Sequence, residues 1–456
     1  MQSADASSKT RAALLHRVFW RLHFWAGLLT APIILFAALT GALYAFTPQI
    51  EAWKYSALDQ ISTPGVAPAL SLDRQLAAAQ AALPNQTVRM IVPAYQARQT
   101  TQVYLEDSAM QQHPSHAMHA EAAKAEHAAH SQAKAVTIAY VNPTNANVQG
   151  SLPESGRFRN WSRKLHSAML QGEGWRWIME LGASWMVLML MTGIYLWWPR
   201  GNAGWRSVLR QPGSANARAG WRYLHGLVAI AMSLMTMTIL LTGLTWSKYA
   251  GDNFRLAQNA MAQNAPRAPR VLQSIQPAAG MSMLPLQAVY DKLRAIAPEV
   301  QLQITPPRTE RGVWRAENYD RSQPQKRFQV MLDAYTGAIL FQSGWEQLPL
   351  LAKATAVGIP FHRGEFGWWN QALLLLVAAS AVFSVVSGYA MWWKRRRAAT
   401  ISAPKVRPAH LRAIPWQLAL AMLVLACALP ALGISLLLLL TLEAMAALTI
   451  NWHRTV

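Results

Sequence analysis

The sequence WRLH at residues 20–23 and the sequence WRYLH at residues 221–225 each open a long apolar segment. The first segment closes on Thr40-Gly41 and the second on Thr242-Gly243, with the same spacing from histidine to glycine. A pattern that recurs in this way indicates an internal repeat. These stretches therefore predict a fold built from a duplicated set of apolar helices.

A second pair of segments repeats as well. His166 precedes an apolar run that ends in GIYLWWPR at residues 193–200, and His362 precedes a run that ends in GYAMWWKR at residues 388–395. The sequence thus predicts four membrane helices, with one histidine at the mouth of each helix.

The composition supports a membrane protein. Hydrophobic residues make up 52% of the 456 residues and charged residues only 14%, and the apolar residues gather in runs of about 20, the length that crosses a hydrocarbon core. A fifth apolar stretch, 414–450, adds one or two C-terminal helices; because it is too long for one helix, we expect two, divided near Pro430 to Gly433. The four expected core spans are 24–47, 175–198, 225–246 and 368–393.

The net charge of +21 is concentrated beside the expected spans. Residues 1–23, 199–224 and 394–413 are rich in Lys and Arg, and their only acidic residue is Asp5. Basic short loops stay in the cytoplasm, which predicts a cytoplasmic N-terminus and places the long segments 48–165 and 247–361 outside. This topology rule already explains the basic charge beside the spans. The expected partner is therefore membrane lipid and not a nucleic acid.

Cysteine use and the N-terminus add two expectations. The single cysteine, Cys427, excludes intrachain disulfides and Cys-based metal clusters. The first apolar run has full span length and no small-residue cleavage site, so we interpret it as a retained signal anchor.

Both long segments have an α+β pattern, in which a helix precedes a short meander of strands. In the first segment we expect a helix at 71–83 and strands at 87–93, 101–105 and 136–141. In the second we expect a helix at 285–296, followed by strands at 300–304, 312–317, 328–332 and 338–341. A turn, Asp333-Ala334-Tyr335-Thr336-Gly337, separates the last two strands, with Gly337 at a left-handed position.

An insertion at 111–132 interrupts the first of these domains and has no hydrophobic period, which predicts a loop. Its imidazoles suit Zn²⁺, Cu²⁺ or Ni²⁺. The candidate metal ligands are His113, His116, His119, His127 and His130.

The four repeated histidines are candidate haem ligands. The predicted topology places His23 and His225 at the cytoplasmic face and His166 and His362 at the outer face. Two neutral imidazoles from neighbouring helices can ligate one haem iron without covalent attachment, so two b-type haems are expected. His16 lies seven residues before His23 and is the alternative ligand if the first helix begins earlier. The alternative to a ligand role is that each histidine lies at the membrane interface, at the level of the lipid headgroups.

Two motifs resemble known families. The Asp333–Gly337 turn resembles the signature of the PepSY domain, and the run ending at residues 193–200 resembles the PepSY-associated transmembrane helix family. The resemblance covers about residues 15–395. It departs from the family pattern at residues 142–147, where Asn142 replaces the aspartate of the turn, and the stretch 396–456 has no counterpart.

Members of this family include haem-carrying reductases of ferric siderophores in the bacterial inner membrane. The resemblance implies a membrane helical bundle with two periplasmic PepSY-like α+β domains. It also implies an oxidoreductase that reduces a ferric siderophore or other ferric chelate and releases Fe²⁺. The sequence contains no nucleotide, flavin or nicotinamide motif, so a quinol or a cytoplasmic donor must supply electrons, and no catalytic residue is assigned. The alternative function is a non-redox, membrane-anchored binding or regulatory protein.

Basic residues of the second domain would attract anionic chelates: Arg308, Arg311, Arg315, Arg321, Lys326 and Arg327.

Overall fold

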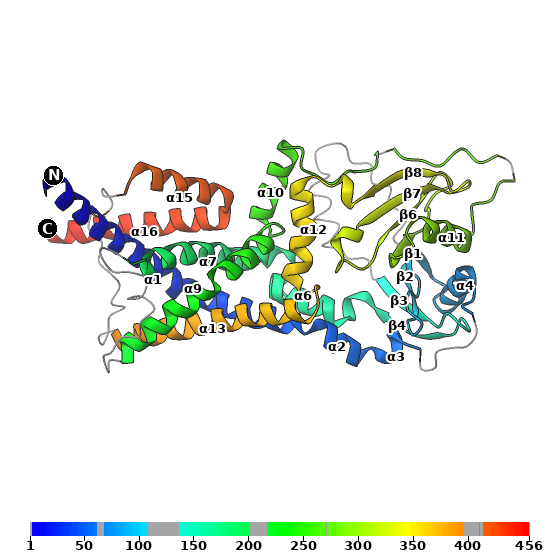
Figure 1. Ribbon diagram of the computed structural model, residues 1–456, viewed down its shortest axis with the longest axis horizontal. Coiled ribbons are helices and arrows are strands. Elements are labelled where there is room, and N and C mark those ends of the chain that lie inside the picture. The colour runs from blue at the N-terminus through cyan, green and yellow to red at the C-terminus, as the bar shows by residue number, and fades with distance from the viewer. Residues whose placement is uncertain are drawn as a thin grey trace. The chain divides into compact units, whose positions relative to one another are not determined.

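The computed structural model describes residues 2–61, 68–107, 136–199, 217–269, 271–278, 280–395, 410 and 414–455. The chain divides into two compact units. The helical unit comprises Met1–Ala45, Leu165–Met261 and Trp369–Val456, and the sheet unit comprises Phe46–Lys164 and Ala262–Trp368. Figure 1 labels the elements of each unit.

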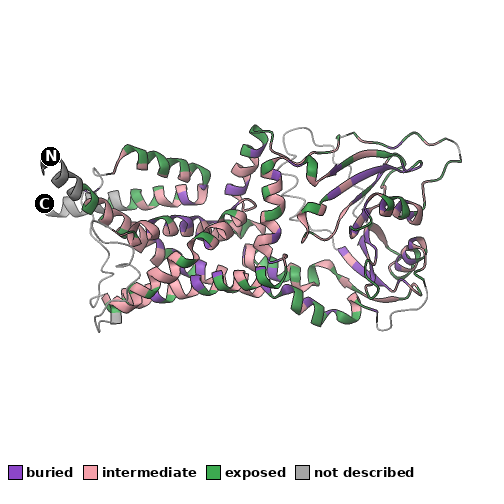
Figure 2. Cartoon of the chain, viewed as in Figure 1, coloured by how far each residue is buried: buried purple, intermediate pink, exposed green. Residues whose placement is uncertain are grey.

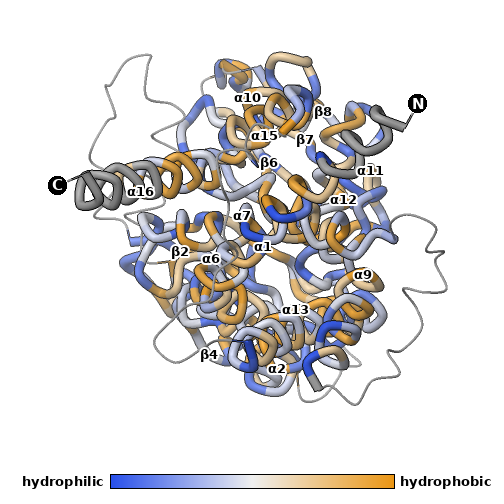
Figure 3. Tube along the Cα trace, turned by 90° about the vertical axis from the view of Figure 1, so that its left-hand side faces the viewer, coloured by the Kyte–Doolittle hydropathy of each residue, from blue (hydrophilic) through white to orange (hydrophobic). Residues whose placement is uncertain are grey.

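Four helices of the described residues are long and apolar enough to cross a membrane. They are α1 (Gln2–Ala45), α7 (Arg176–Trp197), α9 (Ala217–Leu244) and α13 (Trp368–Arg395). The shortest, α7, is about 33 Å long at 1.5 Å per residue, enough for a core of about 30 Å. Large apolar side chains such as Leu234 and Leu376 are exposed on them, as expected where lipid is the solvent, and their hydropathy can be followed in Figure 3.

Helix α1 is longer than the sequence pattern predicted. The expected span began at residue 24, whereas the helix begins at Gln2 and includes residues 2–23, which we expected to lie in a separate cytoplasmic stretch, 1–23. Residues 2–22 contain neither glycine nor proline and are rich in Ala, Leu and Arg, which favour helix. His16 therefore lies on the same helix as His23.

The C-terminal stretch forms two helices, as predicted. Helix α15 (Trp416–Ala428) and helix α16 (Pro430–Thr455) are divided at Leu429. A Cβ on Gly433 would lie 2.6 Å from the carbonyl oxygen of Ala426, so only glycine permits this close turn. Helix α16 is tied to α7 by a hydrogen bond of 2.9 Å from Trp185 Nε1 to Ser435 Oγ.

Helix α10 (Tyr249–Ala260) follows α9 and is anchored by a buried carboxylate. Glu180 of α7 accepts hydrogen bonds from the backbone N–H groups of Tyr249 at 2.7 Å and Ala250 at 2.9 Å. A carboxylate at a helix N-terminus satisfies free donors and complements the helix dipole. Glu180 thus has a structural role.

The sheet unit contains one antiparallel sheet of eight strands, in the order β4-β3-β2-β1-β5-β6-β7-β8. Its buried residues follow the strands in Figure 2. The sequence predicted two separate domains and missed β4, whose residues are mostly partly exposed. The strands are β1 (Gln86–Val92), β2 (Thr101–Asp107), β3 (Val136–Val141), β4 (Val148–Pro153), β5 (Leu302–Thr305), β6 (Val313–Asn318), β7 (Phe328–Asp333) and β8 (Ile339–Gly344).

The two halves of this sheet meet at β1 and β5, where Ile91 pairs with Ile304. Each half consists of a helix followed by a four-stranded meander, and one hydrophobic core is shared by both halves. Because both inner strands would be unpaired edges in separate domains, their pairing protects each edge. The helices are α4 (Leu72–Ala82) and α11 (Leu286–Ile296).

The two helices cap each other. Asp73 of α4 accepts from the N–H groups of Leu286 at 2.8 Å and Gln287 at 3.1 Å. In return, the side-chain oxygen of Gln287 accepts from the N–H of Leu72 at 2.9 Å. Each helix therefore satisfies donors that the other would leave free at its N-terminus.

The two halves also end their third strands in equivalent turns. In the second half, Gly337 (φ 67°) donates its N–H to the Asp333 carbonyl, and the Asp333 carboxylate caps the turn. In the first half, Ala146 (φ 59°) donates to the Asn142 carbonyl, and the Asn142 side chain accepts from Thr144. The departure from the family motif at Asn142 therefore preserves the turn.

Four shorter helices connect the units' main elements. They include two helices on which the outer histidines lie, which the sequence did not predict as separate elements. The four are α2 (Thr47–Lys54), α3 (Ser56–Asp59), α6 (Phe158–Ala168) and α12 (Leu350–Arg363).

Candidate functional site

A cavity of about 790 Å³ lies within the helical unit, between α1, α7, α9 and α13. Both predicted inner ligands, His23 and His225, line it, and so does the alternative ligand His16. Its apolar lining includes Leu28, Ile34, Met186, Met189, Ile230 and Val385.

The rings of His23 and His225 lie close together. Their centroids are 6.4 Å apart and their planes are perpendicular. A metal atom bound to one nitrogen of each ring at about 2.0–2.1 Å holds the ring centres roughly 6 Å apart. The pair therefore has the separation that a bis-histidine site needs, which supports His23 over His16.

Each of these histidines has a hydroxyl partner on a facing helix. His23 Nδ1 lies 3.0 Å from Thr192 Oγ1, and His225 Nδ1 lies 2.8 Å from Ser387 Oγ. The sequence interpretation missed both hydroxyls. The signal was present, because a hydroxyl residue precedes a glycine in each of the four spans: Thr40-Gly41, Thr192-Gly193, Thr242-Gly243 and Ser387-Gly388.

The glycines of these dipeptides lie against the imidazole rings. A Cβ on Gly193 would lie 3.3 Å from Cε1 of His23, and one on Gly388 would lie 3.9 Å from Cε1 of His225. The first distance is tighter than ordinary van der Waals contact, so a side chain at residue 193 would push the ring. The glycines make room for the histidines of facing helices.

The cavity has a basic end. Arg218, Arg222 and Arg395 line it, and no acidic side chain of the described residues does. The guanidinium of Arg395 stacks over the rings of Trp20 at 5.1 Å and Phe24 at 4.9 Å. Such a site suits a flat, apolar group that carries acidic substituents, which is the chemistry of haem with its two propionates.

The outer histidines do not lie on the spans themselves. His166 lies in the last turn of α6, and α6 is separated from α7 by Met169, Leu170 and Gly172, which all have positive φ. His362 lies in the last turn of α12, which ends at Gly364 with φ 74°. The sequence placed both at the mouths of membrane helices, but these left-handed residues break the chain before each span.

His166 nevertheless has the environment of the inner histidines. Its Nδ1 lies 2.9 Å from Oγ1 of Thr40, and a Cβ on Gly41 would lie 3.4 Å from its Cε1. His362 is half-buried and belongs to the sheet unit. The pairing of His166 with His362 stays a prediction.

The predicted basic surface of the sheet unit is partly neutralised. Arg308 pairs with Glu106 at 3.0 Å and Lys326 with Glu299 at 3.1 Å. Arg327 instead lines a pocket of about 240 Å³, with Arg267, Gln329 and the buried Ser343.

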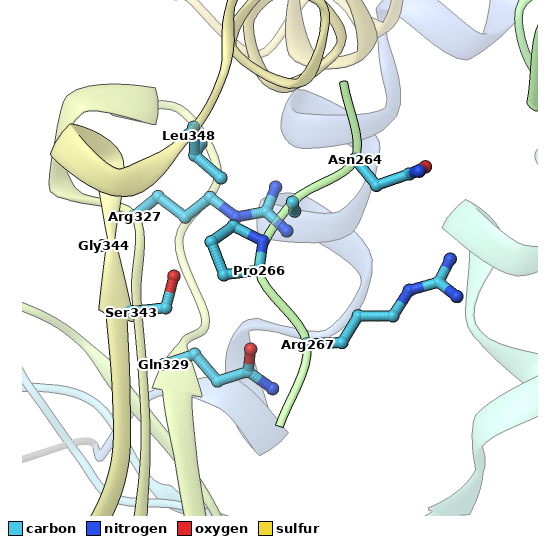
Figure 4. Close-up of a pocket in the computed structure, with 9 residues that line it drawn as sticks. Asn264, Pro266, Arg267, Arg327, Gln329, Ser343, Gly344 and Leu348 are labelled. Carbon is cyan, nitrogen blue, oxygen red and sulfur yellow. The ribbon is translucent and has the colours of Figure 1, made fainter. Parts of the chain in front are cut away.

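Figure 4 shows Arg327 and Gln329 reaching toward the segment that carries Pro266, while Arg267 points away. Partial burial and the nearby charge of Arg321 lower the pKa of Arg327. No acidic side chain of the described residues lines the pocket. An anion bound beside Arg327 would relieve both effects.

The predicted metal ligands His113, His116, His119, His127 and His130 lie outside the described residues. Within the described residues, no group of three or more His, Cys, Asp or Glu side chains is placed to hold a metal ion. The metal site of the insertion therefore stays a prediction.

Similarity to known proteins agrees with this architecture. No curated protein is similar to the chain in sequence. The family described as PepSY-associated TM region matches residues 20–395, a range that reaches from α1 to the end of α13. Because the match covers most of the chain and includes three of the four apolar helices and the greater part of the first, the chain is a multi-pass membrane protein and belongs to the PepSY-associated TM region family.

Proposed function

We propose that the chain is a membrane oxidoreductase that passes electrons through two b-type haems to a ferric siderophore or another ferric chelate. The observation that carries the proposal is the pair His23 and His225, whose rings lie 6.4 Å apart in a cavity that no acidic side chain of the described residues lines. Histidines whose only role is to lie at the level of the lipid headgroups would not need to face each other across a cavity. Haem held by two imidazoles carries one electron at a time as its iron alternates between Fe(III) and Fe(II).

Two kinds of side chain in the cavity would bind the haem. His23 and His225 present imidazole nitrogens from α1 and α9, while Arg218, Arg222 and Arg395 neutralise the acidic edge of the group. His166 and His362 are proposed for a second haem, because they repeat the sequence pattern and His166 has the same hydroxyl–glycine neighbour. Two haems would divide a core of about 30 Å into shorter electron-transfer steps.

The proposed direction is outward across the bacterial inner membrane. The basic segments 1–23, 199–224 and 394–413 would be cytoplasmic, and the sheet unit would face the periplasm. A quinol or a cytoplasmic donor supplies the electrons. Each ferric ion takes up one electron and leaves as Fe²⁺, which oxygen donors hold less tightly. Arg327 and its pocket give an anionic chelate a place to dock.

We also infer that the chain arose by duplication. The repeated His–Gly spacing in the spans, the two helix-plus-meander halves of the sheet and their equivalent turns support this inference. The mutual capping of α4 and α11 gives a physical reason why the halves stay joined.

The full chain, purified and reconstituted in vesicles, tests the function. We expect a red protein with two haems per chain by the pyridine haemochrome assay. After chemical reduction, an added ferric chelate should reoxidise the haem faster than a chelate-free control, and ferrozine should trap Fe²⁺. A colourless protein would instead favour the membrane-anchored binding role. A haem protein that ferric chelates never reoxidise would serve another acceptor.

A further inference from the structure

Three of the four repeated histidines share one local arrangement. The Nδ1 atom of His23, His225 or His166 lies 2.8–3.0 Å from the hydroxyl of Thr192, Ser387 or Thr40, respectively. In each case the hydroxyl residue is followed by a glycine that lies beside Cε1 of the same ring. An arrangement found three times indicates a common role.

Each of these hydroxyl groups already donates its single hydrogen to a backbone carbonyl of its own helix. Thr192 Oγ1 lies 2.8 Å from the carbonyl oxygen of Leu188, and Ser387 Oγ lies 2.7 Å from that of Phe383. Thr40 repeats this bond, at 2.7 Å from the Phe36 carbonyl oxygen. Two oxygen atoms at such a distance need a hydrogen between them, and serine and threonine in helices commonly donate to this carbonyl. The hydroxyl hydrogen therefore points along its own helix.

This assignment decides the state of the ring. A hydroxyl that donates to the backbone can only accept from the histidine, so Nδ1 must carry the hydrogen. In a neutral imidazole the other nitrogen, Nε2, then carries the lone pair. The reverse tautomer would turn the hydroxyl hydrogen toward Nδ1 and leave two oxygen atoms 2.7–2.8 Å apart with no hydrogen between them.

We propose that Thr192 and Ser387 are positioning residues that fix His23 and His225 in the Nδ1–H tautomer and present Nε2 to the cavity as a ligand, and that Thr40 fixes His166 in the same tautomer. The proposal rests on the proposed function for the identity of the metal group. The glycine that follows each hydroxyl lies beside the ring, and at Gly193 a Cβ only 3.3 Å from Cε1 of His23 would crowd it.

The arrangement has a chemical consequence for a bound haem. A ligand whose Nδ1–H donates a hydrogen bond is more basic, and such outer partners commonly change metal affinity by about 10–100-fold. A more basic ligand stabilises Fe(III) relative to Fe(II). Removing the hydroxyl should therefore weaken haem binding and raise the midpoint potential.

Helix α13 offers a matched control for the test. Ser380 lies seven residues before Ser387, is also buried, and donates to the Val377 carbonyl at 2.8 Å. No hydrogen bond joins Ser380 to a histidine in the described part of the chain. Ser387→Ala and Ser380→Ala remove the same atom from the same helix, and they differ in the contact with His225.

In the full-length protein, Ser387→Ala should weaken haem binding by about 10–100-fold and raise the midpoint potential. Ser380→Ala, at a serine that lines the same cavity without a hydrogen bond to a histidine in the described residues, should change both much less. Ser387→Thr should restore both. Thr192→Val, which keeps the shape of threonine, should repeat the loss at His23. Wild-type haem affinity and potential in both Ser387→Ala and Thr192→Val would overturn the proposal.

A second measurement reads the tautomer without haem. In haem-free protein with ¹⁵N-labelled histidine, NMR should show a protonated Nδ1 and an unprotonated Nε2 at His23 and His225, assigned by signal loss in His23→Gln and His225→Gln. Ser387→Ala should make the His225 signals a mixture of tautomers. An unprotonated Nδ1 in the wild type overturns the proposal even if the protein reduces ferric chelates. A wild type that never binds haem removes the proposed function, and the tautomer is still decided by this spectrum.

Discussion

At the scale of single residues, histidine geometry separates two candidate ligands that the sequence left open. His16 and His23 lie on the same helix and line the same cavity, and His23 has a hydroxyl partner in Thr192 and faces the ring of His225. Of the two histidines, His23 is therefore expected to ligate the inner haem, and His16 is expected to be dispensable for it.

This expectation can be checked by haem content. His23→Ala should lose about half of the haem per chain, because one of the two proposed sites would lack an axial ligand. His16→Ala, the control on the same helix, should keep full haem content. Full haem in His23→Ala together with a loss in His16→Ala would reverse the assignment, and the pyridine haemochrome assay measures both.

The turn at Asp333 gives a pH-dependent prediction. The carboxylate is 1% exposed, and burial alone would raise its pKa, but hydrogen bonds from Thr336, Ile275 and Tyr335 outweigh that and lower it. A folded-state pKa below the unfolded value of about 3.9 contributes stability that is present above that value and is lost as the pH falls through the folded pKa.

Asp333→Asn should therefore speed amide exchange at residues 333–338 at neutral pH. The asparagine cannot accept from the Ile275 N–H with a second oxygen, a loss of about 1–2 kcal/mol. The difference from wild type should shrink toward pH 3, when both proteins are compared at each pH. Asn142→Asp, the converse change in the first half, should keep its turn. A difference between Asp333→Asn and wild type that is the same at pH 3 and pH 7 would contradict the argument.

At this scale the sequence predicted the histidines but not what holds them. The four ligand candidates could be found because imidazole beside a repeated apolar span is rare and conspicuous. Thr192 and Ser387 were missed although each precedes a glycine in its span, since a hydroxyl in an apolar helix usually bonds only its own backbone. Their contact with His23 and His225 depends on which helices lie side by side.

At the scale of elements, the mutual capping of α4 and α11 is the most testable contact. Asp73→Ala leaves the N–H groups of Leu286 and Gln287 without an acceptor. We expect a cost of about 1–2 kcal/mol, seen as roughly 5–30-fold faster hydrogen exchange in both helices of the full-length protein. Asp107→Ala removes an exposed carboxylate that accepts a hydrogen bond from the side chain of Gln86 and should have little effect. Faster exchange in α4 alone would show that α11 does not depend on Asp73.

Elements were predictable where the pattern is long and were missed where it is broken. The spans of α7, α9 and α13 follow from length and hydropathy, and the strands from alternation. The helices α6 and α12 were merged with the spans because residues such as Leu170 and Gly364 must adopt positive φ to separate them, and hydropathy does not report φ. The single sheet was missed because the pairing of β1 with β5 joins residues far apart in the sequence.

At the scale of the whole molecule, the proposed reduction of an anionic chelate gives the basic surface residues a role in attracting and binding that chelate. Long-range attraction depends on net charge, whereas docking depends on a group that is free to pair. Arg327 and Lys326 are adjacent and carry the same charge, but Lys326 is already paired with Glu299 while Arg327 lines a pocket. Substituting each residue in turn therefore distinguishes long-range attraction of the chelate from its docking.

Arg327→Ala should raise the KM for an anionic ferric chelate by about tenfold, since a charge-assisted hydrogen bond is worth about 1.5 kcal/mol. Lys326→Ala lowers the net charge equally and should change KM little, and neither variant should alter haem content. The measurement is ferrozine-detected Fe²⁺ release as a function of chelate concentration, at low and at moderate salt. If both variants raise KM equally and salt abolishes the difference from wild type, the chelate is attracted by general charge and the pocket at Arg327 does not bind it. A neutral ferric chelate should be insensitive to Arg327→Ala, because it has no charge for the guanidinium to meet.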